Sequence, residues 1–256
     1  MKTIGLIGGL GPESTVDYYK SIIHGSTGGR PDPVYPEIII YSVNMTEVMA
    51  MVTGGNRGKL TDFLLGKIGA LHRAGAELGA IASNTPHIVF DEVAARSPIP
   101  LVSIVEATLE YACTNSLKRC GLMGTATTMA NDFYRKAFDR RAIEVVMPSE
   151  KEQQLIHHRI FSEIEIGIFN DSTREELLAI TRRMIADEGI DALILGCTEL
   201  PLILTGSAFS GIPFLNTTAI HCRKIVESAI LHPGSVVSGE LSIWKVVAAK
   251  SLNSID

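Results

Sequence analysis

Residues 193–201 read Leu-Ile-Leu-Gly-Cys-Thr-Glu-Leu-Pro, an apolar run that ends at Cys197 and continues into residues that favour a helix. The run is too short for a buried helix, so it predicts a parallel strand that is covered on both faces. The thiol of Cys197 then stands at the carboxyl end of that strand, where open α/β sheets bind their ligands. This stretch therefore predicts both a fold class and the position of a site.

An internal repeat extends this prediction to the rest of the chain. Gly9 and Thr125 end two matching segments that are 116 residues apart, and Ser83 and Cys197 occupy equivalent positions in two others that are 114 residues apart. A third pair, residues 99–103 and 212–216, has an offset of 113. Three matches in the same order indicate an internal duplication. We therefore expect an α/β fold of two similar lobes, each a parallel-stranded sheet flanked by helices, related by pseudo-twofold symmetry.

The lobes are assigned by position in the repeat. The first lobe is predicted to comprise residues 1–98 and about 213–232, the second to comprise residues 99–212, and residues 233–256 form a tail to which we assign no role. In this arrangement the strand ends that carry Ser83 and Cys197 face each other across one cleft.

Composition narrows the class of partner. The 256 residues carry a net charge of −5, which argues against nucleic-acid binding, and no apolar run reaches the roughly 18 residues of a membrane span. The first residues lack a signal-peptide pattern, so a cytoplasmic location is expected. The four cysteines show neither metal-ligand spacing nor a disulfide framework, so we expect no metal and reduced thiols. A small molecule is the expected partner.

Periodicity and turn residues predict the remaining elements. Strands are expected at residues 4–8, 37–43, 78–82, 99–103, 120–125, 143–147 and 212–215, and helices at 60–74, 150–166 and 173–187 and from Thr217. Residues 51–55, Met-Val-Thr-Gly-Gly, predict a flexible loop over the site. The glycine turn at residues 8–14 lacks the third glycine and the acidic ribose ligand of a dinucleotide site, and instead predicts an anion-binding helix start.

Two proton-handling groups on opposite sides of one carbon are what inversion at that carbon requires. Cys197 precedes a helix start, and a helix N-terminus lowers the pKa of a thiol. The hydroxyls of Thr85 and Thr198 and the neighbouring amides are suited to a substrate carboxylate. The repeat thus predicts Cys197 and Ser83 as the catalytic pair.

Three segments together resemble the cofactor-independent aspartate/glutamate racemase family, namely residues 8–14, 83–87 and 196–201. Glu199 points to the aspartate-racemase branch. The resemblance implies a two-lobed α/β fold, no PLP or metal, a homodimer, and an acidic amino acid as substrate, aspartate or glutamate. It implies that Asn84, Thr85 and Thr198 hold the α-carboxylate and that Cys197 is the acid/base for the L-enantiomer. The full set expected to contact substrate is Gly9, Leu10, Asn84, Thr85, Thr125, Thr128, Thr198 and Glu199.

Ser83 departs from the family pattern, because members commonly have cysteine in both lobes. A hydroxyl is a far weaker acid than a thiol. This leaves an L-preferring racemase, a weakened relative that only binds acidic amino acids, or a chain in which serine was substituted for cysteine. A related isomerase or decarboxylase with a single cysteine is a further alternative. No arginine matches the residue that holds the distal carboxylate in some aspartate racemases, although Arg57 is a candidate from the predicted loop region.

Several of these residues also have a purely structural interpretation. Ser83 is a good N-cap for the following helix, and Glu199 suits the first turn of a helix through its charge. Thr125 and Thr128 suit a helix start in the second lobe. His87 is more simply a buried structural histidine than a catalytic one. The sequence leaves these alternatives open.

Overall fold

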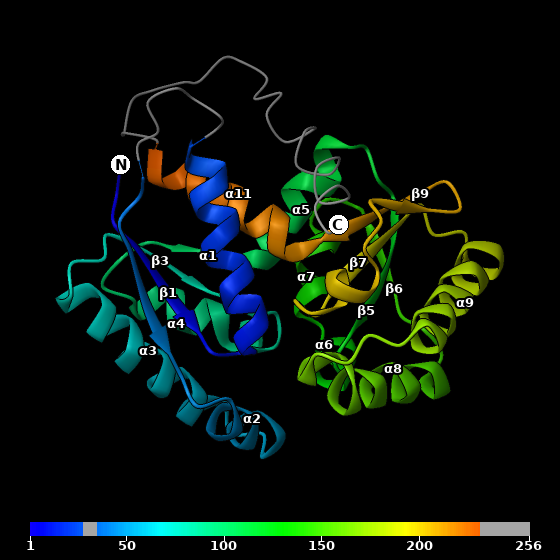
Figure 1. The fold of residues 1–256 in the computed structure, drawn as a ribbon, viewed down its shortest axis with the longest axis horizontal. Helices are drawn as coiled ribbons and strands as arrows, with labels where there is room; N and C mark the ends of the chain where they lie inside the picture. Colours follow the sequence, from blue (N-terminus) through cyan, green and yellow to red (C-terminus); the bar gives the residue numbers. More distant parts are fainter. Residues whose placement is uncertain (28–34, 231–256) are drawn as a thin grey trace, which may run out of the picture.

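A computed structural model describes residues 1–27 and 35–230, which form two β-sheets flanked by helices (Figure 1). The predicted α/β class with parallel-stranded sheets is confirmed. Residues 231–232 of the predicted first lobe and the predicted tail, 233–256, lie outside the described residues.

The first sheet is wholly parallel within the described residues. Its strand order is β2 (Ile38–Ser42), β1 (Ile4–Gly8), β3 (Leu78–Ile81) and β4 (Leu101–Val102). The second sheet has the order β6 (Glu144–Val146), β5 (Arg119–Gly124), β7 (Ala192–Gly196), β9 (Ile212–Asn216) and β8 (Ala208–Phe209), and only β8 is antiparallel. The matched segments of the repeat therefore hold corresponding positions, with β1, β3 and β4 equivalent to β5, β7 and β9.

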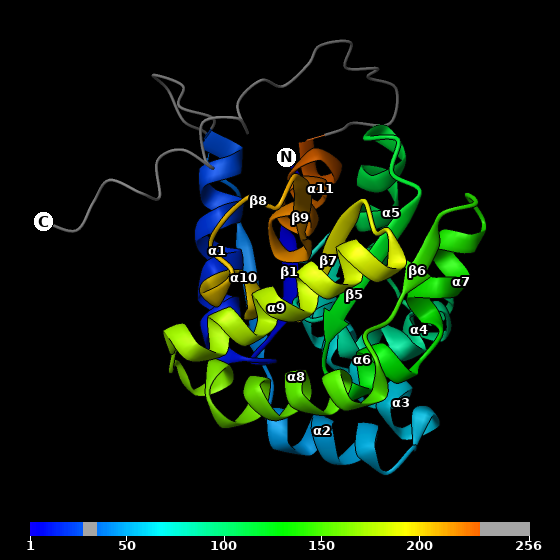
Figure 2. The same cartoon turned by 90° about the vertical axis from the view of Figure 1, so that its right-hand side faces the viewer.

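Helices connect the strands and cover the sheets. Those of the first part of the chain are α1 (Pro12–Thr27), α2 (Met45–Thr53), α3 (Arg57–Arg73), the 3-10 helix η1 (Thr85–Val89), α4 (Phe90–Arg96) and α5 (Ile104–Thr114). The second part has α6 (Ala126–Ala130), α7 (Phe133–Asp139), α8 (Glu150–Ser162), the 3-10 helix η2 (Ile164–Ile166), α9 (Asp171–Glu188), α10 (Leu200–Ile203) and α11 (Thr217–Ile230). In the turned view, α8 and α9 lie in front of the second sheet (Figure 2).

The central strands β1, β3 and β7 are buried on both faces, which explains why they are apolar without alternation, whereas the edge strand β2 is partly exposed. Successive strand residues point to opposite faces. Leu193 and Leu195 accordingly belong to one core cluster, together with Ile156 of α8, while Ile194 belongs to the cluster on the other face. In the first sheet Leu6 and Ile7 divide in the same way.

The predicted flexible loop at residues 51–55 is wrong for its first three residues. Residues 51–53 form the last turn of α2, whose start is capped by the side chain of Asn44, which accepts a hydrogen bond from Thr46 N at 3.0 Å. Val48, Met51 and Val52 bury an apolar face. This face stabilises the helix, a tertiary effect that the short Gly-Gly signal conceals.

The C-terminal part of the described chain is shared between the sheets. β9 pairs with β7 in the second sheet, whereas Cys222, Ile225 and Val226 of α11 pack in one cluster with residues of β1 and β3. α11 lies beside α1 in both views (Figures 1 and 2). The exact lobe boundaries at residues 98 and 212 stay a prediction.

Candidate active site

A cavity lies where β3 and β7 end, and both halves of the chain line it. Ser83 and Cys197, the pair that the repeat predicts to face each other, are both lining residues. The cavity volume is about 30 Å³, room for one or two water molecules. Its walls must therefore move apart to admit an amino acid.

Most of the predicted site residues meet at this cavity. The predicted residues that line it are Leu10, Ser83, Asn84, Thr85, Thr125, Cys197, Thr198 and Glu199. Gly9 and Thr128 do not line it. The Gly9 N–H donates to Thr15 Oγ1 at 2.8 Å, and its φ of +82° suits glycine. A Cβ on Gly9 would lie 2.5 Å from the Val43 carbonyl oxygen. The glycine therefore allows the chain to turn towards the cavity without itself lining it.

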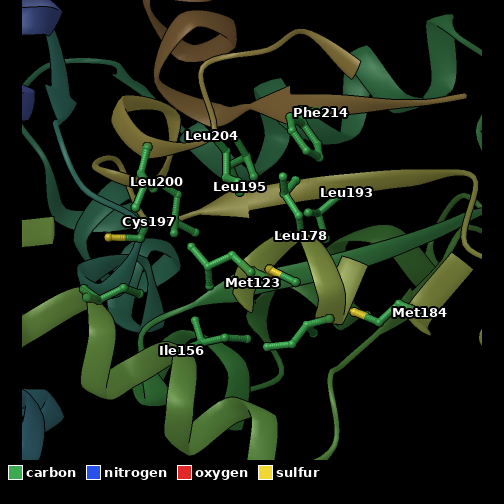
Figure 3. Close-up of a cluster of buried hydrophobic side chains, with 14 of the residues drawn as sticks. Met123, Ile156, Leu178, Met184, Leu193, Leu195, Cys197, Leu200, Leu204 and Phe214 are labelled. Atoms are coloured by element: carbon green, nitrogen blue, oxygen red, sulfur yellow. The ribbon is translucent and has the colours of Figure 1, made fainter. Parts of the chain in front are cut away.

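Cys197 is held by its neighbour in sequence. Its Sγ–H donates to Glu199 Oε2 at 3.2 Å, and the Thr198 hydroxyl donates to the same oxygen at 2.8 Å. The Gly11 N–H donates to the other oxygen, Oε1, at 3.4 Å. Figure 3 shows Cys197 at the edge of a core cluster with its sulfur directed away from Met123 and Leu195. The thiol thus faces the cavity beside a carboxylate that can accept its proton.

The predicted lowering of the Cys197 pKa is wrong for this arrangement. Burial, followed by the negative charges of Glu199 and Glu165, raises the pKa of the Cys197 thiol well above its usual range. The helix that follows, α10, is only 4 residues long. Its dipole is therefore too weak to offset burial and two carboxylates. The resting side chain is a thiol that requires a base.

Three threonine hydroxyls from both halves of the chain form a closed set. Thr85 Oγ1 lies 3.1 Å from Thr125 Oγ1 and 3.2 Å from Thr128 Oγ1, and the last two lie 3.1 Å apart. Thr128 is fully buried behind the two threonines that line the cavity. Thr125 also caps α6, because its side chain accepts from Thr128 N. The structural and substrate-facing interpretations of this residue are therefore compatible.

Asn84 is positioned by two buried partners. Its Oδ1 accepts from the Tyr134 hydroxyl at 2.6 Å, and its Nδ2 donates to Thr217 Oγ1 at 3.2 Å. Thr217 in turn donates to the Leu195 carbonyl oxygen of β7 at 2.8 Å. These contacts fix the side chain next to Thr85.

Ser83 is 9% exposed and lines the cavity. The alternative in which it caps the next helix is wrong, because no side chain caps the start of η1 within the described residues. Its backbone N–H donates to the Ile81 carbonyl oxygen at 2.8 Å, a tight turn that bends the chain where β3 ends. The hydroxyl thus stands at a position equivalent to that of the Cys197 thiol.

Glu165 is the main residue of the cavity that sequence reasoning missed. It belongs to η2, at the end of the segment that is predicted to form one helix over residues 150–166 but in which α8 ends at Ser162, and no motif marks it. Burial, followed by the charge of Glu199, raises the pKa of the Glu165 carboxyl to about 7. The remaining missed lining residues are mainly apolar, and they are Met45, Val48, Met49, Pro86, Phe161 and Gly196.

Arg57 does not reach this cavity, which corrects its candidacy for a distal carboxylate. Its Nη2 donates to Asn131 Oδ1 at 2.9 Å, and it lines a separate cavity of about 310 Å³. His87 lines that second cavity too. Its Nε2 accepts from Ile104 N at 3.3 Å and its ring stacks on Phe90. The structural interpretation of His87 is therefore supported.

Within residues 1–27 and 35–230, which the structure describes, no three His, Cys, Asp or Glu side chains are grouped so that they could hold a metal ion. In the same ranges no helix is both long and apolar enough to cross a membrane.

Comparison with known proteins identifies relatives over nearly the whole chain. A family model described as Asp/Glu/Hydantoin racemase matches residues 7–225. A broad specificity amino-acid racemase of Bacillus subtilis is 23% identical over 232 residues, covering 90% of this chain and 99% of the relative.

Solved structures give the same result. An aspartate racemase homologue from Pyrococcus horikoshii is similar with a TM-score of 0.76 and 38% identity, covering 90% of this chain and 99% of that one. A candidate Asp/Glu racemase from Yersinia pestis is similar with a TM-score of 0.81 and 30% identity, covering 90% of this chain and 100% of that one.

Proposed function

Because the chain belongs to the Asp/Glu/hydantoin racemase family, we propose that it inverts the Cα of an L-amino acid by proton transfer without a cofactor. The observation that carries the proposal is the placement of Cys197 and Ser83 at the ends of equivalent strands, on the wall of one cavity. A pair of groups that face one carbon from two lobes suits removal of a proton from one face and its return to the other.

Cys197 acts as the principal acid/base in this proposal. Its thiol proton passes to Glu199, to which it is already hydrogen-bonded, and the thiolate then takes the Cα proton of the L-substrate. The developing negative charge spreads onto the α-carboxylate. Asn84, Thr85 and Thr198 hold that carboxylate, with support from Gly9, Leu10, Thr125 and Thr128.

Ser83 returns a proton to the opposite face of Cα. Its hydroxyl gives up a proton to the carbanion and regains one from the protonated Glu199 through water, so the cycle ends with every group in its starting state. An unassisted serine is a poor base for the D-enantiomer. Cα exchange with solvent is therefore faster from the L-side than from the D-side, and in this sense the enzyme is L-preferring.

Aspartate and glutamate are the first substrates to test, because an acidic substrate is consistent with the family. The test is incubation of the protein with a panel of L-amino acids, aspartate and glutamate included, in deuterated water. We expect loss of the Cα–H signal by NMR and D-product by chiral chromatography. If no amino acid in the panel shows either loss of the Cα–H signal or D-product, the proposal is wrong.

The Ser83→Cys variant tests the assigned geometry. A thiol at this position supplies a competent base for the D-enantiomer, so the rate of Cα–H exchange with solvent from the D-side is expected to rise about 100-fold or more. Exchange from the L-side changes little by comparison. An equal change in the Cα–H exchange rates of the two enantiomers would contradict the assignment of Ser83 to the D-side.

A further inference from the structure

The charged groups that line the cavity are all negative. Among the described lining residues Glu165 and Glu199 are the acidic groups, and no Lys, Arg or His is present. The two carboxylates converge on one place, because a Cβ built on Gly11 would lie 2.9 Å from Glu199 Oε1 and 3.4 Å from Glu165 Oε1. A substrate that brings a second carboxylate here meets like charge, which disfavours binding.

The two carboxylates differ in how far they are satisfied. Glu199 accepts hydrogen bonds from Cys197, Thr198 and Gly11. Glu165 Oε2 is buried and has no hydrogen-bond partner within the described residues. A buried polar atom without a partner is costly, and a charged donor recovers more of that cost than a neutral one. Glu165 is therefore the group that lacks a ligand.

The walls beside Glu165 suit an apolar chain. Met45, Val48 and Met49 come from α2, and Phe161 comes from the end of α8. Flexible thioethers adapt to chains of different length. A side chain with a methylene stem and a cationic end matches such a surface, because the stem packs on the apolar wall while the charge reaches a carboxylate.

We propose that the substrate is an amino acid with a cationic side chain, of the lysine, ornithine or arginine class, whose terminal cation binds Glu165. The proposal rests on the proposed racemase function and names the substrate of that same site. The net charge of such a substrate is positive, whereas aspartate or glutamate adds negative charge to a cavity that holds two carboxylates and no cation among its described lining residues.

The test measures Cα exchange and calorimetric affinity for L-lysine, L-arginine, L-methionine, L-aspartate and L-glutamate. We expect L-lysine or L-arginine to exchange and bind about tenfold better than the acidic amino acids, the factor that one hydrogen bond to a charged group supplies. A preference for L-aspartate or L-glutamate in both measurements would overturn the inference and leave the racemase function standing. If no amino acid exchanges, the racemase function fails, and the order of affinities still decides the inference.

Glu165→Gln keeps the shape and removes the charge. It is expected to weaken L-lysine binding about ten- to 100-fold, while L-methionine binding changes less than about twofold. Glu47→Gln is the matched control, because Glu47 is exposed on α2 and does not line the cavity. An equal loss for L-lysine and L-methionine in Glu165→Gln would place the α-ammonium on Glu165 and overturn the proposal.

Discussion

At the scale of single residues, the chemistry depends on the environment of one thiol. Cys197 is 5% exposed, and Glu199 accepts its proton at 3.2 Å while also contributing to its raised pKa. The Glu199 carboxylate therefore disfavours a thiolate at Cys197 in the resting state, and it also accepts the proton when the thiol ionises. A thiolate that forms only when the proton can move to Glu199 is protected from reaction with other electrophiles.

The Glu199→Gln variant separates these two effects. Removal of the negative charge lowers the pKa of the Cys197 thiol, because after burial that charge contributes most to raising it. Alkylation of Cys197, followed by mass spectrometry against pH, is expected to begin at lower pH than in the wild type, while Cα exchange slows because the proton acceptor is lost. The exposed Cys113 serves as the internal control. An unchanged alkylation profile of Cys197 would contradict the assigned contact.

At the scale of elements, the repeat predicts where the strands lie better than it predicts the helices that pack around the site. The strand at residues 4–8 and the strand before Cys197 are predictable, because apolar residues followed by a glycine turn leave few alternatives. The matched segments form β1, β3 and β4 in one sheet and β5, β7 and β9 in the same order in the other. Helix α2 is not predictable in this way, since its stability comes from tertiary burial of Val48.

The candidate site shows the same division. Ser83, Asn84 and Thr85 are predictable because they follow a strand, and strand ends share one edge of a sheet. Glu165 is not, because it enters the cavity from η2 at the end of a long helical segment and belongs to neither copy of the repeat motif. The direction of the Cys197 pKa shift is not predictable from the local sequence either, because it depends on carboxylates that folding brings together.

Helix α2 is expected to control access to the cavity, because Met45, Val48 and Met49 form part of its wall. Asn44→Ala removes the side-chain cap of α2 and Asn56→Ala removes the cap of α3, which does not line the cavity. Both variants are expected to lower the free energy of unfolding by about 0.5–2 kcal/mol. Only Asn44→Ala should also raise the KM for Cα exchange. Equal KM values in the two variants would contradict a role for α2 in substrate access.

At the scale of the whole molecule, the buried side chain of His221 links elements that are far apart in the sequence. His221 Nδ1 lies 2.8 Å from the Tyr18 hydroxyl and its Nε2 lies 3.0 Å from the Val102 carbonyl oxygen, so it joins α11 to α1 and β4. Burial lowers the pKa of His221 to about 4. The unfolded chain, with a histidine pKa of about 6.5, therefore binds more protons between these values.

The sign of the pH effect follows from this difference. The contribution of His221 is fully present above pH 6.5 or so and is lost as the pH falls towards about 4. In His221→Gln, the fall of Tm over this range is expected to be smaller than in the wild type. His72→Gln, at an exposed position, should retain the wild-type slope. A His221→Gln slope equal to that of the wild type would contradict the linkage.

The central claim, that Cys197 removes the Cα proton of the substrate in a cavity shared by both halves of the chain, is tested most directly by deuterium exchange at Cα. The measurement compares the wild type with Cys197→Ser and with Cys113→Ser, whose thiol is exposed and outside the cavity. The account predicts that Cys197→Ser lowers the exchange rate by a factor of about 10²–10⁴, while Cys113→Ser exchanges like the wild type. Undiminished exchange in folded Cys197→Ser would contradict it.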